Sequence, residues 1–151
     1  TIAWTTIIFG ILLFISDKFK TEKNIKENLS YKSVIFIGLL QILSLIPGVS
    51  RSGIAITAAR FLNFNRVDAA KISFLLSIPI LAAVSFYGFK NILLSGDPIF
   101  TKFNLISILL SFLISLLTIK FLLSFINKFN LNFFVYYRVF LGACLLLLAY
   151  L

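Results

Sequence analysis

Long apolar runs that contain no charged residue dominate this chain of 151 residues. Hydrophobic residues make up 60% of the sequence and charged residues 13%, whereas an average soluble domain carries about 25% charged residues. The chain therefore lacks the side chains needed to solvate a globular surface, and its apolar content also excludes a disordered protein. Because helices satisfy their own backbone hydrogen bonds in lipid, we expect an all-α integral membrane protein.

The apolar runs predict where the chain crosses the membrane. A helix needs roughly 20 residues to cross a hydrocarbon core of about 30 Å. We expect transmembrane helices at residues 1–16, 72–89, 103–120 and 132–151, in a single membrane domain, and a polar, Lys-rich loop at residues 17–32. The chain contains no Met and opens directly into an apolar run, so we expect it to be part of a longer protein.

Residues 33–62 do not fit a single transmembrane helix, because Pro47 and Gly48 interrupt them and Arg51 follows. At 1.5 Å per residue, the two arms of this segment are about 22 Å and 16 Å long. Neither arm crosses the hydrocarbon core by itself, but both reach its middle. The pattern predicts a re-entrant hairpin whose tip lies at residues 47–53.

The distribution of basic residues supports re-entry. If the hairpin returns to its own side, ten Lys and Arg residues gather there and two lie opposite, whereas a full crossing gives seven and five. The positive-inside rule favours the first arrangement, with the 17–32 loop and the hairpin entry cytoplasmic and residues 90–102 outside. The net charge of +9 then belongs to loops that face anionic lipid, and we expect no nucleic-acid partner.

The hairpin tip reads Pro47-Gly48-Val49-Ser50-Arg51-Ser52-Gly53. An Arg at the bilayer middle costs at least about 2.5 kcal/mol, so it normally faces protein, water or a partner. Ser50 or Ser52 would cap the second arm, which brings free backbone N–H groups, two hydroxyls and a guanidinium to one point. A guanidinium can hold two phosphate oxygens at once, so the tip indicates a site for an anion such as pyrophosphate. The alternative is a kinked helix whose Arg snorkels, although Arg51 lies 18 residues after the start and 11 residues before the end of the hairpin.

The run from Gln41 to Gly53, with Phe74-Leu75-Leu76-Ser77-Ile78-Pro79 downstream, resembles the bacterial undecaprenyl-pyrophosphate phosphatase family, known for bacitracin resistance. Ser16-Asp17-Lys18 and Tyr137-Arg138 extend the likeness over essentially the whole chain, in register with the C-terminal part of the family. The resemblance implies a multi-pass hydrolase of the bacterial inner membrane. It would convert undecaprenyl pyrophosphate to undecaprenyl phosphate, the lipid carrier recycled for cell-wall synthesis.

The resemblance also implies one half of an inverted repeat in which two re-entrant hairpins meet at mid-membrane. The other hairpin, with a glutamate-rich motif, a serine-containing loop and a histidine, is expected in a missing N-terminal half. The present chain has no His, and its acids lie in predicted loops or at helix ends: Asp17, Glu22, Glu27, Asp68 and Asp97. We therefore expect this chain to supply the phosphate clamp and the missing half to supply the general base. Any divalent cation, Mg²⁺ or Ca²⁺, would also take its ligands from that half.

The resemblance carries roles onto the tip residues. Arg51 would bind the pyrophosphate and stabilise charge during phosphoryl transfer. Ser50 and Ser52 would donate hydrogen bonds, and Gly48 and Gly53 would let the backbone approach the phosphate. Ser50 as a nucleophile is the weaker alternative, because no base is visible in this half.

Three further positions have weaker assignments. The sequence departs from the family at Ala55, where Thr is common, and Thr57 lies about 200° further round a helix, so it substitutes only if the tip is irregular. Gln41, which shares a helix face with Ser44, can order water or phosphate or bond a neighbouring helix. Arg138 is expected to pair with the missing half or to anchor at the cytoplasmic interface, with a structural role favoured.

Two other functions use the same features. A transporter or flippase of the lipid carrier would bind the pyrophosphate head group at Arg51 without hydrolysing it. A helical module with only a packing role would need Arg51 for insertion or assembly. Release of phosphate separates the enzyme from both.

Overall fold

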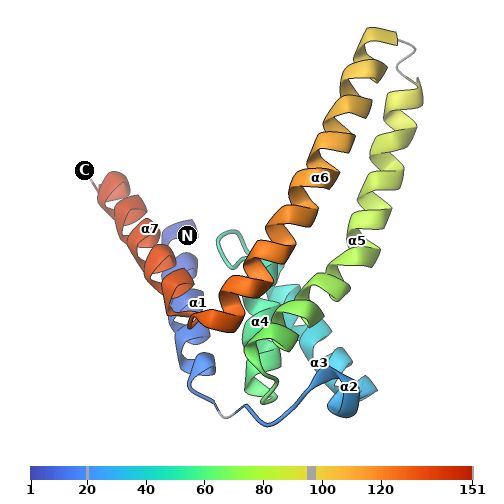
Figure 1. Ribbon diagram of the computed structural model, residues 1–151. Helices are drawn as coiled ribbons and strands as arrows, with labels where there is room; N and C mark the ends of the chain where they lie inside the picture. Colours follow the sequence, from blue (N-terminus) through green and yellow to red (C-terminus); the bar gives the residue numbers. More distant parts are fainter. Residues whose placement is uncertain (20, 95–97, 151) are drawn as a thin grey trace. The chain divides into compact units, whose positions relative to one another are not determined.

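The computed structural model describes residues 1–19, 21–94 and 98–150, and these residues are almost entirely helical (Figure 1). The helices are α1 (Ile2–Asp17), α2 (Ile25–Asn28), α3 (Tyr31–Gln41), the 3-10 helix η1 (Ile42–Leu45), α4 (Arg51–Phe61), α5 (Arg66–Leu94), α6 (Pro98–Lys128) and α7 (Asn132–Tyr150). They form two compact units. Unit 1 comprises Thr1–Leu75 and Ile126–Leu151, and unit 2 comprises Leu76–Phe125.

Among the described residues, three helices are long and apolar enough to cross a membrane, which confirms an all-α integral membrane protein. The candidate spans are Arg66–Lys90, Lys102–Lys128 and Asn132–Tyr150. Helices α5 and α6 extend beyond the expected ranges 72–89 and 103–120 at both ends. The expected ranges stopped at charged residues, but a charged side chain near a helix end can reach the interface without interrupting the helix.

The expected loops also differ in detail from the structure. The 17–32 loop contains the short helix α2, and α3 begins at Tyr31 rather than at residue 33. Most of the expected outer segment 90–102 is helical, because α5 ends at Leu94 and α6 begins at Pro98. Its residues 95–97 lie outside the described residues, as does Lys20 of the basic loop.

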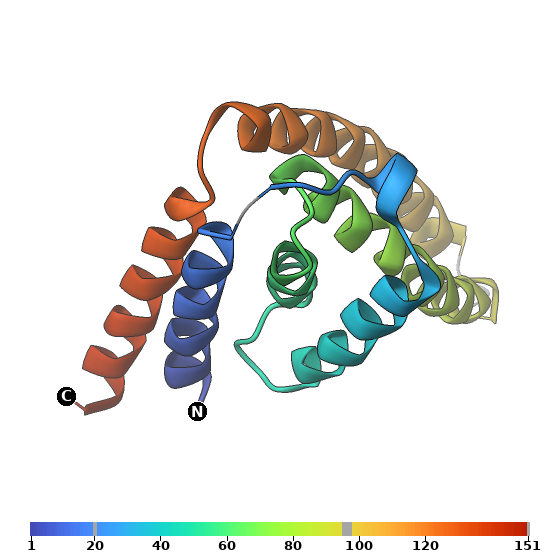
Figure 2. The same cartoon turned by 90° about the horizontal axis from the view of Figure 1, so that it is seen from below.

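Helix α4 lies at the centre of unit 1, in contact with both α1 and α3 (Figure 2). Its buried apolar residues are Ile54, Ala55, Ala58 and Ala59, each no more than 4% exposed. Their mostly small side chains allow neighbouring helices to approach closely, as is typical of packing in lipid. The turn that leads into α4 is therefore attached to the core of unit 1.

Helices α1 and α7 run antiparallel and side by side (Figures 1 and 2). A Cβ added at Gly142 would lie 2.5 Å from Ile7 Cγ1 and 3.1 Å from the Ala3 carbonyl oxygen, so only glycine fits. Gly10 faces the Cβ of Arg138, 3.4 Å from where its own Cβ would be. This close contact fixes the position of Arg138 relative to α1.

An ionic cluster joins the ends of α1 and α4 to the start of α5. The Asp17 carboxylate accepts hydrogen bonds from Arg66 Nε at 2.7 Å and Nη2 at 3.0 Å. Arg60, whose side chain is 1% exposed, donates to the carbonyl oxygens of Asp17, Phe19 and Phe64 at 2.7–2.8 Å. Two guanidinium groups thus share one carboxylate that is 5% exposed. The cluster fixes the end of the hairpin opposite its tip.

A second polar contact holds the basic loop against α5. Asp68 accepts from the Ile25 backbone N–H at 3.0 Å, from Asn65 Nδ2 at 2.9 Å and from Lys71 Nζ at 3.2 Å. Nearby, Lys23 and Phe64 form an isolated β-bridge. These contacts lie at the same end of unit 1 as the Asp17 cluster.

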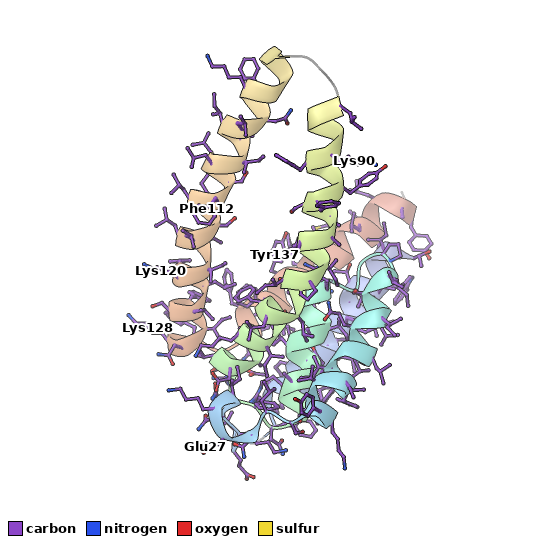
Figure 3. The ribbon with its side chains drawn as sticks, turned by 90° about the vertical axis from the view of Figure 1, so that its right-hand side faces the viewer. Glu27, Lys90, Phe112, Lys120, Lys128 and Tyr137 are labelled. Carbon is purple, nitrogen blue, oxygen red and sulfur yellow. The ribbon has the colours of Figure 1, made fainter. Side chains whose placement is uncertain are left out.

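Within unit 2, α5 and α6 run in opposite directions, with Lys90 near one end and Lys120 near the other (Figures 1 and 3). Among the described residues, none in the most apolar part of α6 is buried, and 11% of the corresponding part of α5 is. Such a large apolar surface requires lipid or another protein surface around it.

Candidate functional site

Residues 31–61 form a helical hairpin, and its turn has a defined geometry. The Val49 N–H donates to the Ile46 carbonyl oxygen at 3.2 Å across Pro47 and Gly48. Gly48 has a φ of 94°, so the segment has the pattern of a type II turn, with Pro in the second position and Gly in the third. The predicted break at Pro47-Gly48 is confirmed. Whether the hairpin re-enters a membrane stays a prediction.

Ser50 begins the second arm of the hairpin as the N-cap of α4. Its Oγ accepts a hydrogen bond from the Gly53 N–H at 3.3 Å, and its carbonyl oxygen accepts from the Ile54 N–H at 3.0 Å. The predicted cap is therefore Ser50 and not Ser52. Ser50 has a φ of 67°, a conformation that is strained for a residue with a side chain. Strain of this kind persists only where the surroundings fix the backbone.

Arg51 is the first residue of α4 and is partly exposed. In the described part of the chain, its guanidinium has no hydrogen-bond or ion-pair partner. The backbone N–H groups of Arg51 and Ser52 stand in the first turn of α4, where no intrahelical acceptor exists. The Ser50 and Ser52 hydroxyls are exposed and lie 3.4 Å apart. The guanidinium, these N–H groups and the two hydroxyls therefore lie together at the start of α4, a composition that suits a phosphate oxyanion.

Side chains of α1 and α7 bond the backbone of the turn. Thr5 Oγ1 donates to the Pro47 carbonyl oxygen at 2.6 Å, and Thr6 Oγ1 lies 3.4 Å from the Gly48 carbonyl oxygen. Arg138 Nη2 donates to the carbonyl oxygens of Gly48 and Val49, both at 2.8 Å. All of these contacts are to backbone oxygens of the turn.

The structure gives Arg138 a partner that the sequence did not identify. Its hydrogen bonds to the hairpin turn of its own chain agree with the structural role that the sequence favoured, and pairing with a missing half stays a prediction. The sequence contained one signal, an Arg within an apolar helix, which needs a partner. It could not identify that partner, because the two sites are about 90 residues apart in the sequence.

A pocket of about 520 Å³ lies between the turn, α1 and α7. Its lining includes Gly48 and four polar or charged residues, Thr6, Ser50, Tyr137 and Arg138. The remaining lining residues are apolar: Ile2, Phe134, Leu141 and Leu145. Gly48 has no room for a side chain here, since a Cβ would lie against Thr5 Oγ1 and 2.6 Å from the Ile2 carbonyl oxygen.

The other predicted site residues are Gly53, Thr57 and Gln41, and only Gly53 lies beside the cap of α4. Gly53 lies beside the cap, where an added Cβ would be 2.7 Å from Arg138 Nη1. Thr57 is 2% exposed, and its hydroxyl donates to the Gly53 carbonyl oxygen at 2.8 Å within α4, so the structure does not bring it to the exposed tip. Gln41 is 9% exposed at the end of α3, and its side chain makes no hydrogen bond to the tip within the described residues.

The charges of unit 1 are separated along α4. The tip carries Arg51 and the guanidinium of Arg138, whereas the acids lie at the opposite end, about 16 Å away along the helix. There, Asp17 and Asp68 are paired with basic side chains. No group of three His, Cys, Asp or Glu residues that could hold a metal ion occurs within the described residues. The tip thus favours an anion and does not by itself fit a metal ion.

Known proteins match nearly the whole chain and not only the hairpin tip. Residues 1–144 match the family described as "Bacitracin resistance protein BacA". The chain is 53% identical over 149 residues to the undecaprenyl-diphosphatase of Pelagibacter ubique, covering 99% of this chain and 58% of the relative. It is 43% identical over 148 residues to that of Elusimicrobium minutum, covering 98% and 55%. The chain spans about half the length of these curated relatives.

Proposed function

The chain belongs to the bacitracin resistance protein BacA family, and we propose that it supplies the phosphate-binding half of a membrane phosphatase that hydrolyses undecaprenyl pyrophosphate. The products would be undecaprenyl phosphate and inorganic phosphate. The name of the relatives, undecaprenyl-diphosphatase, supports the substrate and the reaction. Membership of a family of bacterial membrane proteins supports a place in the bacterial inner membrane.

One observation carries the proposal: Arg51 stands at the start of α4 with no partner among the residues that the structure describes. An unpaired guanidinium in an apolar hairpin is unfavourable unless an anion or water compensates it. A pyrophosphate group provides several oxygens that a planar guanidinium can hold in pairs. The free N–H groups of Arg51 and Ser52 supply further donors on the same turn.

The proposed reaction divides its tasks between this chain and the rest of the protein. A water molecule attacks the terminal phosphorus, the bond from that phosphorus to the bridging oxygen breaks, and the bridging oxygen remains on undecaprenyl phosphate. Arg51 would stabilise the charge on the phosphate oxygens, and Ser50 and Ser52 would orient them. The base that takes the proton from water would come from outside this chain, since Asp17 and Asp68 are paired at the opposite end of α4.

A divalent cation, if the reaction uses one, would be held by ligands from outside this chain. The described residues do not fit such an ion, because no cluster of metal-binding side chains lies near the tip. We therefore assign no step of the reaction to a cation. The missing N-terminal half remains the proposed source of both the ligands and the base.

We further propose that residues 31–61 re-enter the membrane from the cytoplasm. The two arms, Tyr31–Leu45 and α4, are both shorter than a spanning helix. The turn lies at the opposite end of α4 from Arg60, Arg66 and the Lys-rich loop. Re-entry would place the donors of the tip near the middle of the bilayer, while the basic residues stay at the cytoplasmic surface.

The same tip also suits a lipid-carrier transporter, but the relatives are named as phosphatases, which favours hydrolysis. The test is phosphate release from undecaprenyl pyrophosphate by this chain alone and by a chimera. In this chimera, which we call the Pelagibacter chimera, the chain replaces the matching segment of the Pelagibacter ubique relative. We expect release from the chimera and none from the chain alone. A folded chimera that binds the lipid without releasing phosphate would support the transporter instead.

A further inference from the structure

We propose that Arg138 is a positioning residue for the phosphate site: it holds the backbone of the hairpin turn so that the donors at the start of α4 face the substrate. This inference rests on the proposed function. Arg138 itself would not touch the phosphate. Its two hydrogen bonds, to the carbonyl oxygens of Gly48 and Val49, are both 2.8 Å long.

The orientation of the turn follows from these bonds. The peptide bonds of the described chain are trans, so a carbonyl oxygen and the N–H of the next residue point in opposite directions. Because Arg138 binds the Val49 carbonyl oxygen, the Ser50 N–H points away from Arg138. No acceptor for that N–H occurs among the described residues. Arg138 thereby sets the direction of a free donor that stands next to Arg51.

The turn needs this support because its backbone is strained. Both Gly48 and Ser50 have a positive φ, and Ser50 carries a side chain. If the turn relaxed, Ser50 would leave the cap position, and Ser50 Oγ would no longer accept from the Gly53 N–H. Arg51 follows directly, so its guanidinium would move with the start of the helix.

Arg138 also offsets two negative partial charges close to the site. The carbonyl oxygens of Gly48 and Val49 lie in the same turn as the phosphate donors, and unpaired carbonyl oxygens there would repel an anion. A guanidinium within the apolar helix α7 is unfavourable unless its N–H groups are bonded, and these two oxygens bond that of Arg138, which is partly exposed. The same two contacts therefore stabilise Arg138 in the helix and the turn beside it.

Arg138→Met tests the inference, because Met is compatible with an apolar helix and leaves the α1–α7 contact at Gly142 intact. In this chain in detergent, we expect faster amide exchange at residues 48–53 and unchanged exchange in α1 and α7. In the Pelagibacter chimera, we expect kcat to fall about 10- to 100-fold and KM to change less than about threefold. Arg138→Lys keeps a charged donor and should restore part of kcat. Tyr136→Phe, on an exposed part of α7 outside the lining of the pocket, is the matched control.

Three results would overturn the inference. The first is unchanged exchange at residues 48–53 in Arg138→Met, and the second is faster exchange there with an unchanged kcat. The third is loss of protection throughout α1 and α7 in both Arg138 variants, which would make Arg138 a residue of general stability. These results are distinct from failure of the proposed function, in which the unsubstituted, folded chimera releases no phosphate.

Discussion

Two arginines at one turn have opposite surroundings, and this difference separates binding from support. Arg138 bonds two backbone oxygens, whereas Arg51 is unpartnered within the part of the chain that the structure describes. A guanidinium that is already bonded on the protein side fixes the backbone. One that is unbonded is available for a ligand. Gly48, whose carbonyl oxygen Arg138 bonds, has a positive φ and no space for a side chain.

We predict that Gly48→Ala destabilises the protein by about 1–3 kcal/mol, because alanine is strained at this φ and its Cβ would collide with Thr5. The free energy of unfolding in detergent measures this effect. Gly38→Ala is the matched control, since nothing lies within 4 Å of its Cβ position and Gly38 stands inside α3. That substitution should stabilise the helix by up to about 1 kcal/mol. Equal effects of the two substitutions would contradict the geometry of the turn.

At the scale of elements, α4 is fixed at both ends by different means. Its start is held through the turn by Thr5 and Arg138, and its end by the ion pairs of Asp17. The helix itself contributes small buried residues that pack against α1 and α3. The position of the tip relative to the core of unit 1 therefore depends on contacts along the whole of α4.

We predict that Asp17→Asn destabilises unit 1 by about 3 kcal/mol, because it leaves Arg60 buried without a carboxylate and removes the paired bonds to Arg66. Thermal unfolding in detergent measures this loss. Glu22→Gln is the control, since Glu22 is an exposed acid in the following loop and should change stability by less than about 0.5 kcal/mol. A loss no larger than that of the control would mean that the cluster contributes little.

The sequence predicted features that depend on neighbouring residues. Pro47-Gly48 stops one helix and Ser50 caps the next, because these effects act over three or four residues. The sequence did not predict that Arg138 bonds the turn or that the Thr57 hydroxyl is hydrogen-bonded within α4, since both depend on how the helices pack. The ends of α5 and α6 were misplaced because the apolar runs stop at charged residues while the helices continue.

At the scale of the whole molecule, the number of membrane crossings decides on which side each loop lies. A re-entrant hairpin puts the 17–32 loop and the α5–α6 connection on opposite sides of the membrane, and a full crossing puts them on the same side. The two ends of unit 2 carry Lys90 and Lys120 respectively (Figure 3). Labelling of single cysteines from one side of the membrane can therefore distinguish the two topologies.

We predict that a membrane-impermeant maleimide added outside intact cells labels Lys102→Cys and does not label Lys26→Cys. Both positions are exposed, and Cys144→Ser removes the single native cysteine. Permeabilised cells provide the control, because both positions should then react. Labelling of both cysteines from outside, or of neither, would contradict re-entry, since a full crossing places the two positions together.

The most direct test of the account is the rate of phosphate release from undecaprenyl pyrophosphate by the Pelagibacter chimera carrying Arg51→Lys. Lysine keeps the charge but cannot reproduce the paired hydrogen bonds of a guanidinium, so we predict a fall in kcat/KM of about 100-fold in a protein that remains folded. Lys71→Arg, at the far end of unit 1, should release phosphate at the unsubstituted rate. Near-normal release by the folded Arg51→Lys protein would contradict the assignment of Arg51 as the phosphate clamp.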